Sequence, residues 1–276
     1  MLKIFKLGRS GYYAWCGRKM SLRTERQCAN EVIVKAAHTQ TRETYGYRRL
    51  HSEVIAQGHK MSQWQVRRTR QRLGLRCKQS KKFKVTTQSN HDMAIAPNLL
   101  NQQFNPSRPN EVWVTDITYV WTDEGWLYLA GVKDVYTCEI VGYAMSSRMT
   151  KELCMSALQL AVVCKKPAGG LIHHSDRGSQ YCSKNYQEQL KKNGMKASMS
   201  RKGNCYDNAP MESFWGSLKN ELVHHTQYKT RQQAQNEITE YIEIFYNRQR
   251  RHSRLGNVSP AQFAKLYWQS DEAVLF

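Results

Sequence analysis

The segment Val112-Trp-Val-Thr-Asp-Ile-Thr-Tyr-Val120 is an apolar, strand-like run that carries one carboxylate, Asp116, near its middle. A second run, Leu171-Ile-His-His-Ser-Asp176, ends on another aspartate, and 35 residues separate Asp176 from a third acid, Glu212. An ionised carboxylate inside an apolar strand is costly unless it is paired or bound to a metal. We expect these three groups, which come from separate elements, to converge into an oxygen-only cage of the kind that suits Mg²⁺.

The pattern around these acids predicts an α/β fold. Three strand-like runs come first, at about 111–121, 126–134 and 139–147, and Asp123-Glu-Gly125 is a good hairpin turn between the first two. The elements expected after them are helices at about 151–165 and 183–193, strands ending at Asp176 and spanning about 195–200, and a helix that begins near Asn208 and carries Glu212. Antiparallel strands followed by alternating helices and strands indicate a mixed sheet.

These residues lie in segments that resemble the catalytic region shared by retroviral integrases and DDE transposases. The resemblance is strongest to bacterial insertion-sequence transposases whose enzyme is made from two overlapping reading frames. The matching segments, in order, are Trp113-Val-Thr-Asp-Ile-Thr-Tyr119, His174-Ser-Asp-Arg-Gly-Ser-Gln-Tyr181, Ser200-Arg-Lys-Gly-Asn-Cys-Tyr-Asp-Asn-Ala-Pro-Met-Glu-Ser-Phe-Trp-Gly-Ser-Leu-Lys219, and Tyr246-Asn-Arg-Gln-Arg-Arg-His252 with Ser259-Pro-Ala-Gln-Phe263. The resemblance implies a ribonuclease H-like catalytic core with a mixed sheet, preceded by an all-α helix-turn-helix domain.

The resemblance also implies roles for the three acids. Asp116, Asp176 and Glu212 would be the catalytic residues and would hold two Mg²⁺ ions, for which Mn²⁺ can substitute, ~4 Å apart at the scissile phosphate. Lys219 lies about two turns, or ~10 Å, beyond Glu212, where these transposases carry a basic residue, and is expected to hold a DNA phosphate. The plainer alternatives are a turn residue for Asp176, a first-turn helix charge for Glu212 and a hydrogen-bonded strand carboxylate for Asp116.

The net charge of +20 is distributed unevenly. Residues 1–108 hold 22 Lys and Arg against 5 Asp and Glu, whereas residues 109–276 hold 20 against 17. This excess predicts double-stranded DNA as the partner of the front part; the alternative is a basic surface kept for solubility. There is no Gly-x-x-x-x-Gly-Lys-Ser/Thr phosphate loop, which argues against ATP.

A helix-turn-helix is expected in the basic front part, and Tyr45-Gly-Tyr-Arg-Arg-Leu50 resembles the corresponding segment of these transposases. A helix at about 22–38 precedes it, its first helix spans about 47–57, and its second follows a capping box of Ser62 and Gln65. The apolar residues expected to face inward are Leu22, Cys28, Val32 and Ala36 in the leading helix and Leu50, Val54 and Ile55 in the first.

The second helix of this motif has the composition of a DNA-recognition helix, because arginine and glutamine reach base edges and phosphates. The residues left to contact DNA would be Gln63, Gln65, Arg67, Arg68, Arg70 and Arg72. The alternative is an ordinary basic helix in a helical hairpin. Unlike retroviral integrases, the chain has no zinc-binding His-His-Cys-Cys module at its front.

The end of the chain combines an amphipathic helix, at about 230–247, with a basic cluster. The cluster, expected to contact DNA phosphates, consists of Arg248, Arg250, Arg251 and Arg254. Zinc at His173-His174 or His224-His225 is disfavoured because no cysteine has suitable spacing. Asp207 is interpreted as part of a helix cap, and the eight cysteines as reduced thiols of a cytosolic protein.

We expect five regions and one function. The regions are an N-terminal helical segment (1–40), a helix-turn-helix DNA-binding domain (41–76), a basic and polar linker (77–108), the catalytic core (109–225) and a C-terminal helical extension (226–276). The expected function is cleavage of insertion-sequence ends and joining to target DNA, in a homo-oligomer on the bacterial nucleoid, with neither a membrane span nor a signal peptide. The absence of a sustained heptad repeat leaves open that an upstream reading frame supplies a partner. The alternatives are a non-catalytic DNA-binding regulator and a ribonuclease H-type nuclease.

Overall fold

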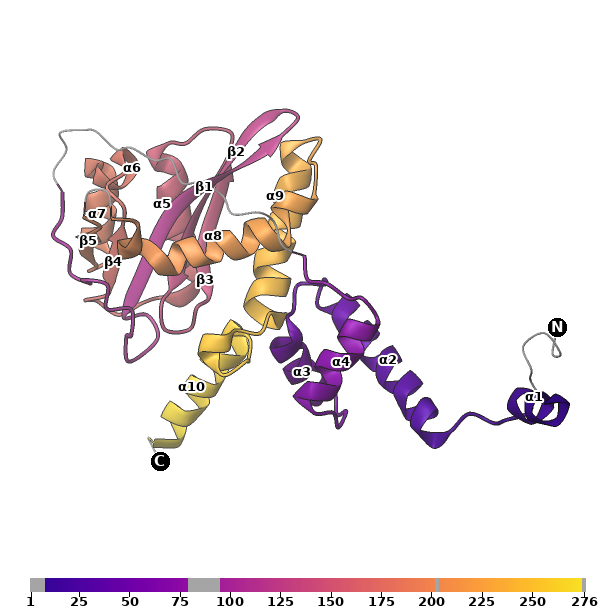
Figure 1. The fold of residues 1–276 in the computed structure, drawn as a ribbon. Helices are drawn as coiled ribbons and strands as arrows, with labels where there is room; N and C mark the ends of the chain where they lie inside the picture. Colours follow the sequence, from indigo (N-terminus) through magenta and orange to yellow (C-terminus); the bar gives the residue numbers. More distant parts are fainter. Residues whose placement is uncertain (1–7, 79–94, 202–203, 275–276) are drawn as a thin grey trace. The chain divides into compact units, whose positions relative to one another are not determined.

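The computed structural model describes residues 8–78, 95–201 and 204–274 of the chain. They divide into two compact units, Met1–Cys77 and Lys78–Phe276 (Figure 1). Three lysines of the expected linker, Lys81, Lys82 and Lys84, lie outside the described residues. Among the residues that the structure describes, no helix has both the length and the apolar character that crossing a membrane requires.

The first unit is all-helical. Its helices are α1 (Arg9–Cys16), α2 (Leu22–Gln40), α3 (Tyr47–Ala56) and α4 (Gln63–Arg72). The capping box at the start of α4 is confirmed, because the Ser62 hydroxyl accepts the Gln65 N–H and the Gln65 side chain accepts the Ser62 N–H. Gly74, with φ +62°, supplies the left-handed residue that ends the helix.

The expected apolar stripe on α2 is wrong. Leu22 and Val32 are 72% and 69% exposed, whereas Val34 and Ala37 are buried. Helix packing is decided by the face that meets α3 and α4, and small side chains on that face allow a close approach. In α3, Leu50 and Val54 are buried as expected, but Ile55 is 45% exposed.

The second unit is built on a five-stranded mixed sheet. Its strand order is β3-β2-β1-β4-β5. The strands are β1 (Val112–Thr122), β2 (Gly125–Asp134), β3 (Ile140–Ser146), β4 (Ile172–Ser175) and β5 (Lys196–Met199). β1, β2 and β3 are antiparallel neighbours, whereas β4 pairs in parallel with both β1 and β5. β1 and β2 continue past the shorter strands as a two-stranded hairpin beside α9 (Figure 1).

Helices cover both faces of this sheet (Figure 1). One face carries α5 (Lys151–Lys165), α6 (Ser179–Cys182) and α7 (Lys184–Lys192), which enclose the core around Trp113, Val132 and Leu158. On the other face α8 (Ala209–Glu221) crosses β1 and β2. The crossing is close, because a Cβ added at Gly131 would stand 2.6 Å from Met211 and 2.9 Å from the Trp215 ring.

The segments before and after this layered core also pack on it. Leu100 is buried, and the Leu99 N–H donates to the Ser198 hydroxyl of β5. The last elements are the short 3₁₀ turns and helices η1 (Cys205–Asn208), η2 (Val223–His225), α9 (Arg231–Glu240), the π-helix η3 (Tyr241–Gln249), η4 (Ser253–Leu255) and α10 (Pro260–Val274). The sequence predicted the helix of α9 and η3 but not α10.

Candidate active site

Asp116 and Asp176 lie at equivalent positions on neighbouring strands. β1 and β4 pair in parallel up to Val114 and His174, and each aspartate follows two residues later. The two strands therefore pair directly, which the expected convergence of Asp116 and Asp176 requires. Because parallel strands in register bring equivalent residues side by side, two inner strands of the sheet hold two carboxylates next to each other, where β4 ends.

Both carboxylates are oriented by N–H groups of the protein. Asp116 Oδ1 accepts the Ile117 N–H at 2.8 Å, and Asp116 Oδ2 accepts the Trp215 indole N–H at 3.1 Å. Asp176 Oδ1 accepts the Gly178 N–H at 2.8 Å. A carboxylate offers about four acceptor positions, so two N–H donors fix the direction of the Asp116 side chain while using only part of its capacity.

The electrostatics of this pair favour a cation. Burial, and next the negative charge of Asp176, raise the pKa of Asp116 to about 7, while the N–H groups of Ile117 and Trp215 oppose the shift. Two carboxylates in one partly buried site repel each other unless a proton or a cation lies between them. All of their donor atoms are oxygens, which hard divalent cations prefer.

Glu212 reaches this region from α8. It is exposed in the first turn of the helix, and its charge acts on Asp116 more weakly than that of Asp176. Across residues 8–78, 95–201 and 204–274, no three His, Cys, Asp or Glu side chains lie close enough together to hold a metal. The structure thus brings two of the three predicted acids together and places the third on the helix that crosses beside them.

The start of α8 is fixed by polar side chains that the sequence did not single out for this purpose. The buried Lys133 ammonium donates to the Pro210 carbonyl at 2.8 Å, and burial lowers the pKa of this lysine to about 8. The Asn208 side-chain amide donates to the Thr115 carbonyl at 3.0 Å, one residue before Asp116. Both bonds tie the helix that carries Glu212 to the sheet that carries the aspartates.

The interpretation of Asp207 as a helix cap is wrong. Its buried carboxylate instead accepts the Arg201 backbone N–H at 2.8 Å and pairs with the Arg201 guanidinium at 2.9 Å. It also accepts the side-chain amides of Asn98 and Gln102. The carboxylate therefore connects residues before the first strand to the turn that leads into α8.

Lys219 lies two turns further along α8, near Asp116. Its ammonium group is 5.2 Å from the centroid of the Tyr119 ring. Burial lowers the pKa of Lys219, and the charge of Asp116 acts in the opposite direction. A cation beside the two aspartates is in a position to meet the phosphate backbone of a DNA bound there.

The two adjacent histidines of β4, His173 and His174, are buried and lie within hydrogen-bonding distance of hydroxyl groups of the protein. His174 is fully buried, with its ring nitrogens 2.8 Å from the Ser198 hydroxyl and 3.1 Å from the Ser200 hydroxyl. His173 points to the opposite side, where its Nε2 lies 3.2 Å from the Tyr186 hydroxyl. Burial lowers the pKa of His173 to about 3 and that of His174 to about 4, so both rings are neutral.

The C-terminal arginines differ in their surroundings. Arg250, expected to contact DNA, is buried and forms a bidentate ion pair with Glu221, with distances of 2.8 and 2.7 Å. This geometry assigns Arg250 to the packing of η3 against α8 and replaces the expected phosphate contact. Arg248 and Arg254 are exposed, although the Arg254 guanidinium donates to the Phe104 carbonyl. Arg251 is partly exposed and donates to the Asn257 carbonyl at 2.8 Å.

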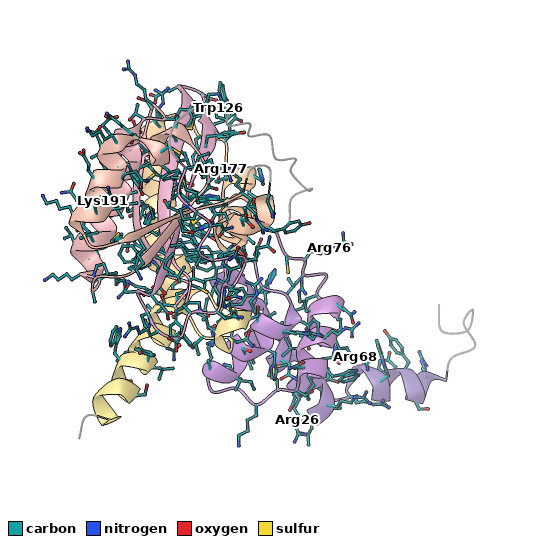
Figure 2. All side chains as sticks on the ribbon, turned by 90° about the vertical axis from the view of Figure 1, so that its left-hand side faces the viewer. Arg26, Arg68, Arg76, Trp126, Arg177 and Lys191 are labelled. Atoms are coloured by element: carbon teal, nitrogen blue, oxygen red, sulfur yellow. The ribbon has the colours of Figure 1, made fainter. Side chains whose placement is uncertain are left out.

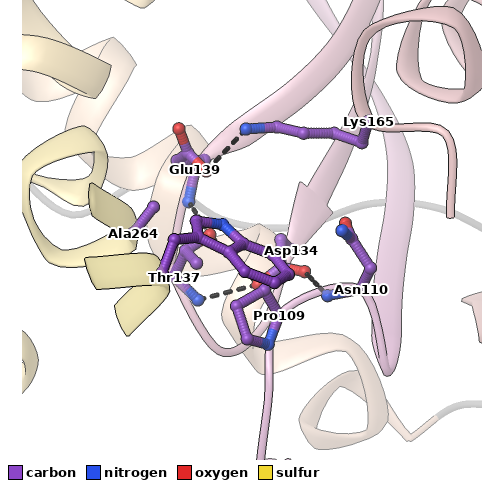
Figure 3. Close-up of a pocket in the computed structure, with 8 residues that line it drawn as sticks. Pro109, Asn110, Asp134, Thr137, Glu139, Lys165 and Ala264 are labelled. Atoms are coloured by element: carbon purple, nitrogen blue, oxygen red, sulfur yellow. Dashed lines mark hydrogen bonds and ion pairs between the residues drawn. The ribbon is translucent and has the colours of Figure 1, made fainter. Parts of the chain in front are cut away.

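A small pocket elsewhere in the second unit is lined by residues that already bond to one another (Figure 3). Asp134 accepts the N–H groups of Asn110 and Thr137, each at 2.7 Å. Lys165 pairs with Glu139 at 2.8 Å. These bonds fix the turn after β2, and we assign the pocket to the structure of that turn.

The six residues predicted to contact DNA from the second helix of the motif are exposed except for Arg70, but three of the six are engaged within the protein. Gln63, Arg67 and Arg68 are exposed, and Arg68 lies over the Trp64 ring at 5.0 Å (Arg68 is labelled in Figure 2). Gln65 is engaged in the capping box, while Arg70 is partly buried beside Cys77 and Arg72 pairs with Glu31 at 2.6 Å. The exposed residues Trp64, Arg67, Arg68 and Gln71 share the spacing of one helical face.

Comparisons with known proteins agree with this architecture. The Integrase core domain family matches residues 106–205, a second Integrase core domain family matches residues 212–266, and an HTH-like domain matches residues 25–83. Transposase InsF for insertion sequence IS3A from Escherichia coli (strain K12) is 44% identical, over 95% of this chain and 92% of its own length. The chain belongs to the IS3 family of transposases.

Two further matches extend the comparison, one in sequence and one in fold. The insertion element IS600 uncharacterized 31 kDa protein of Shigella sonnei is 58% identical, over 98% of this chain and 99% of that protein. A chain of the simian T-cell lymphotropic virus intasome, solved with PP2A regulatory subunit B56 gamma, has a TM-score of 0.50 at 15% identity. That match covers 84% of this chain and 74% of the other. The expected ribonuclease H-like integrase core, with a helical region before it, is confirmed.

Proposed function

We propose that this transposase cleaves DNA at the ends of its insertion element and joins a 3′-hydroxyl to target DNA, with Asp116, Asp176 and Glu212 as its catalytic residues. The observation that carries the proposal is the pair of aspartates in register on β1 and β4, beside the helix that carries Glu212. A regulator that only binds DNA would gain nothing from two repelling carboxylates in one partly buried site.

The three acids fit divalent metal ions. Asp116, Asp176 and Glu212 would hold two Mg²⁺, or Mn²⁺ in their place, because the donor set consists only of carboxylate oxygens. Bound there, the ions supply Lewis-acid activation of water or of a 3′-hydroxyl and stabilise the departing oxygen.

The protein's own groups position the acids and bind the DNA. The N–H groups of Ile117 and Trp215 hold the Asp116 carboxylate in one orientation, so its oxygens are placed before DNA arrives. Lys133 and Asn208 hold the start of α8, which limits the positions that Glu212 can reach. Lys219 binds a DNA phosphate next to the aspartates.

We also propose the partners of the enzyme, the role of each region of the chain and its location in the cell. Duplex DNA, both the element ends and the target, is the substrate, and joining two DNA segments favours an oligomer of this chain. The product of an upstream reading frame would bind the DNA together with this oligomer. We assign DNA recognition to 41–76 together with the N-terminal helical segment 1–40, connection to 77–108 and catalysis to 109–225. Additional phosphate contacts are assigned to 226–276, at Arg248, Arg251 and Arg254. Such an enzyme would work at the bacterial nucleoid in the cytoplasm.

Replacing both Arg67 and Arg68 by alanine should lower the affinity for duplex DNA by roughly 10- to 100-fold, because both guanidinium groups are exposed on one face of α4. The slope of log affinity against log salt should also become shallower by about 2, one phosphate contact for each arginine. Anisotropy titrations at several salt concentrations measure both effects. Arg26→Ala, an exposed arginine on α2, is the matched control, and equal losses for the control and the double variant would contradict the assignment.

The joining reaction itself tests the proposed function. Labelled duplexes that carry the two ends of the element, incubated with the full protein and Mg²⁺, should yield covalently joined DNA on a denaturing gel. Products that are only nicked would favour a nuclease. Binding without any Mg²⁺-dependent product, under conditions in which the complex assembles, would favour a regulator.

A further inference from the structure

Three large aromatic side chains are exposed together on the β1–β2 hairpin. Tyr119, Trp121 and Trp126 are 37%, 56% and 43% exposed. The Trp126 ring contacts the other two edge-to-face, with centroid distances of 4.9 Å to Tyr119 and 4.8 Å to Trp121. We call these three residues the hairpin aromatic cluster; Figure 2 labels Trp126 at one end of the second unit.

The hairpin that carries the cluster is held firmly. The Asp123 N–H donates to the Tyr228 carbonyl at 2.9 Å, and the Arg231 N–H donates to the Glu124 carboxylate at 2.8 Å. The Arg231 guanidinium also donates to the Trp126 carbonyl at 3.1 Å. The segment before α9 therefore braces the turn, and the rings are presented in a fixed arrangement although they are exposed. Clustered apolar surface of this kind marks a contact site.

The cluster is close to the proposed catalytic residues. Tyr119 and Trp121 follow Asp116 on β1 by three and five residues, so their rings lie on the face of the strand opposite the Asp116 carboxylate. Lys219, whose ammonium group lies over the Tyr119 ring, connects the cluster to the aspartates.

We propose that the hairpin aromatic cluster stacks the unpaired bases of a DNA end whose backbone is held at the active site. The inference rests on the proposed function, since it names the form of DNA that this site accepts. Aromatic rings stack on any base, and a neighbouring cation holds the backbone, which is the usual combination in proteins that bind single strands. In an intact duplex the base faces are hidden, so the cluster selects ends that have opened.

Charge favours nucleic acid over a second copy of the chain as the occupant. Lys219 borders the cluster on one side, and the Arg231 guanidinium, 3.0 Å from a Cβ position at Gly125, borders it on the other. The turn of the hairpin also carries two exposed acids, Asp123 and Glu124, so the match to a polyanion with π faces lies on the Tyr119 side, where Lys219 lies beside the rings.

The test compares forked and fully paired DNA. The probe is a fluorescein-labelled duplex that ends in two unpaired five-nucleotide arms, with the blunt duplex of the same sequence as its reference. Binding is measured by anisotropy with the full protein in EDTA, so the result does not depend on cleavage or joining. We expect the wild type to bind the fork at least about 10-fold more tightly than the blunt duplex.

Trp121→Ala combined with Trp126→Ala should remove this preference and leave the affinity for the blunt duplex within about twofold, because base stacking contributes about 10-fold or more. Trp268→Ala, a similarly exposed tryptophan on α10, is the matched control and should bind both DNAs as the wild type does. Trp121→Phe combined with Trp126→Phe should keep most of the preference. Thermal unfolding of each variant checks that the hairpin is intact.

Two outcomes would overturn the inference. One is a wild type without fork preference, or an alanine double variant that keeps it. The other is a double variant that sediments as a smaller species while its fork preference is unchanged, which would make the cluster an interface between copies. The two proposals can fail separately. If the alanine double variant loses its preference for the fork but the wild type never joins DNA, the proposed function is contradicted and the stacking site is supported.

Discussion

Asp116→Asn, Asp176→Asn and Glu212→Gln should each lower Mg²⁺-dependent cleavage and joining by at least about 1,000-fold, or ~4 kcal/mol in the activation free energy. The reason is that each change replaces an anionic oxygen ligand by a neutral amide while keeping the size of the side chain. Initial rates of joined and nicked products, measured on labelled element-end DNA, provide the comparison.

The fold should survive these changes. Asp116→Asn removes a buried charge that Asp176 repels, so the midpoint of thermal unfolding should stay the same or rise. Binding of duplex DNA should change little. Asp123→Asn, an exposed aspartate on the same hairpin, serves as the matched control and should keep wild-type rates. Strand joining that persists in any of the three variants would remove that residue from the catalytic set.

Arg250→Ala should destabilise the second unit by about 3–5 kcal/mol, because it leaves the Glu221 carboxylate buried without its cation. Arg250 and Glu221 are each 8% exposed at the side chain, and the Tyr241 hydroxyl donates to the same carboxylate at 2.8 Å. Chemical denaturation, followed by circular dichroism, measures the free energy of unfolding.

The neighbouring Arg248 is the natural control for that experiment, because it lies two residues before Arg250, in the π-helix η3, and is exposed. Arg248→Ala should change the free energy of unfolding by no more than about 0.5 kcal/mol. Combining Arg250→Met with Glu221→Leu should recover much of the loss, since no unpaired charge remains buried. An Arg250→Ala protein as stable as the Arg248→Ala protein would contradict a structural role for the ion pair.

The sequence predicted the sheet well because its signals are local. Alternating apolar residues, the hairpin turn before Gly125 and the run that ends on Asp176 each determine a strand without reference to distant parts of the chain. The register of β1 against β4 then follows from the fold class, and it brings Asp116 next to Asp176. These two residues and the strands that carry them could therefore be found from the sequence.

The sequence did not predict which side chains of a helix or basic run are buried, because this depends on the elements that pack against them. The basic run Arg248–Arg254 does not reveal that Arg250 alone is buried, because the π-helix ends at Gln249 and the backbone becomes extended at Arg250. Likewise, α2 buries Val34 and Ala37 rather than Leu22 and Val32, since its buried face is the one that meets α3 and α4, which the spacing of apolar residues within α2 does not reveal.

One missed residue did carry a usable signal. Lys133 lies inside an apolar strand, as Asp116 does, and the cost of burying an ionised group applies equally to both. That reasoning would have predicted a buried bond for Lys133, and the structure shows one to the Pro210 carbonyl. Its partner could not be foreseen, because 77 residues separate the two positions and only the crossing of α8 over β2 brings them together.

The binding of metal ions tests most directly whether the three acids form one site. Electron paramagnetic resonance of Mn²⁺, added to the full protein with element-end DNA, counts the bound ions without requiring a reaction. Our account predicts about two tightly bound Mn²⁺ per active site in the wild type, and loss of tight binding in both Asp116→Asn and Asp176→Asn. The same number of bound ions in the wild type and in these variants would contradict it.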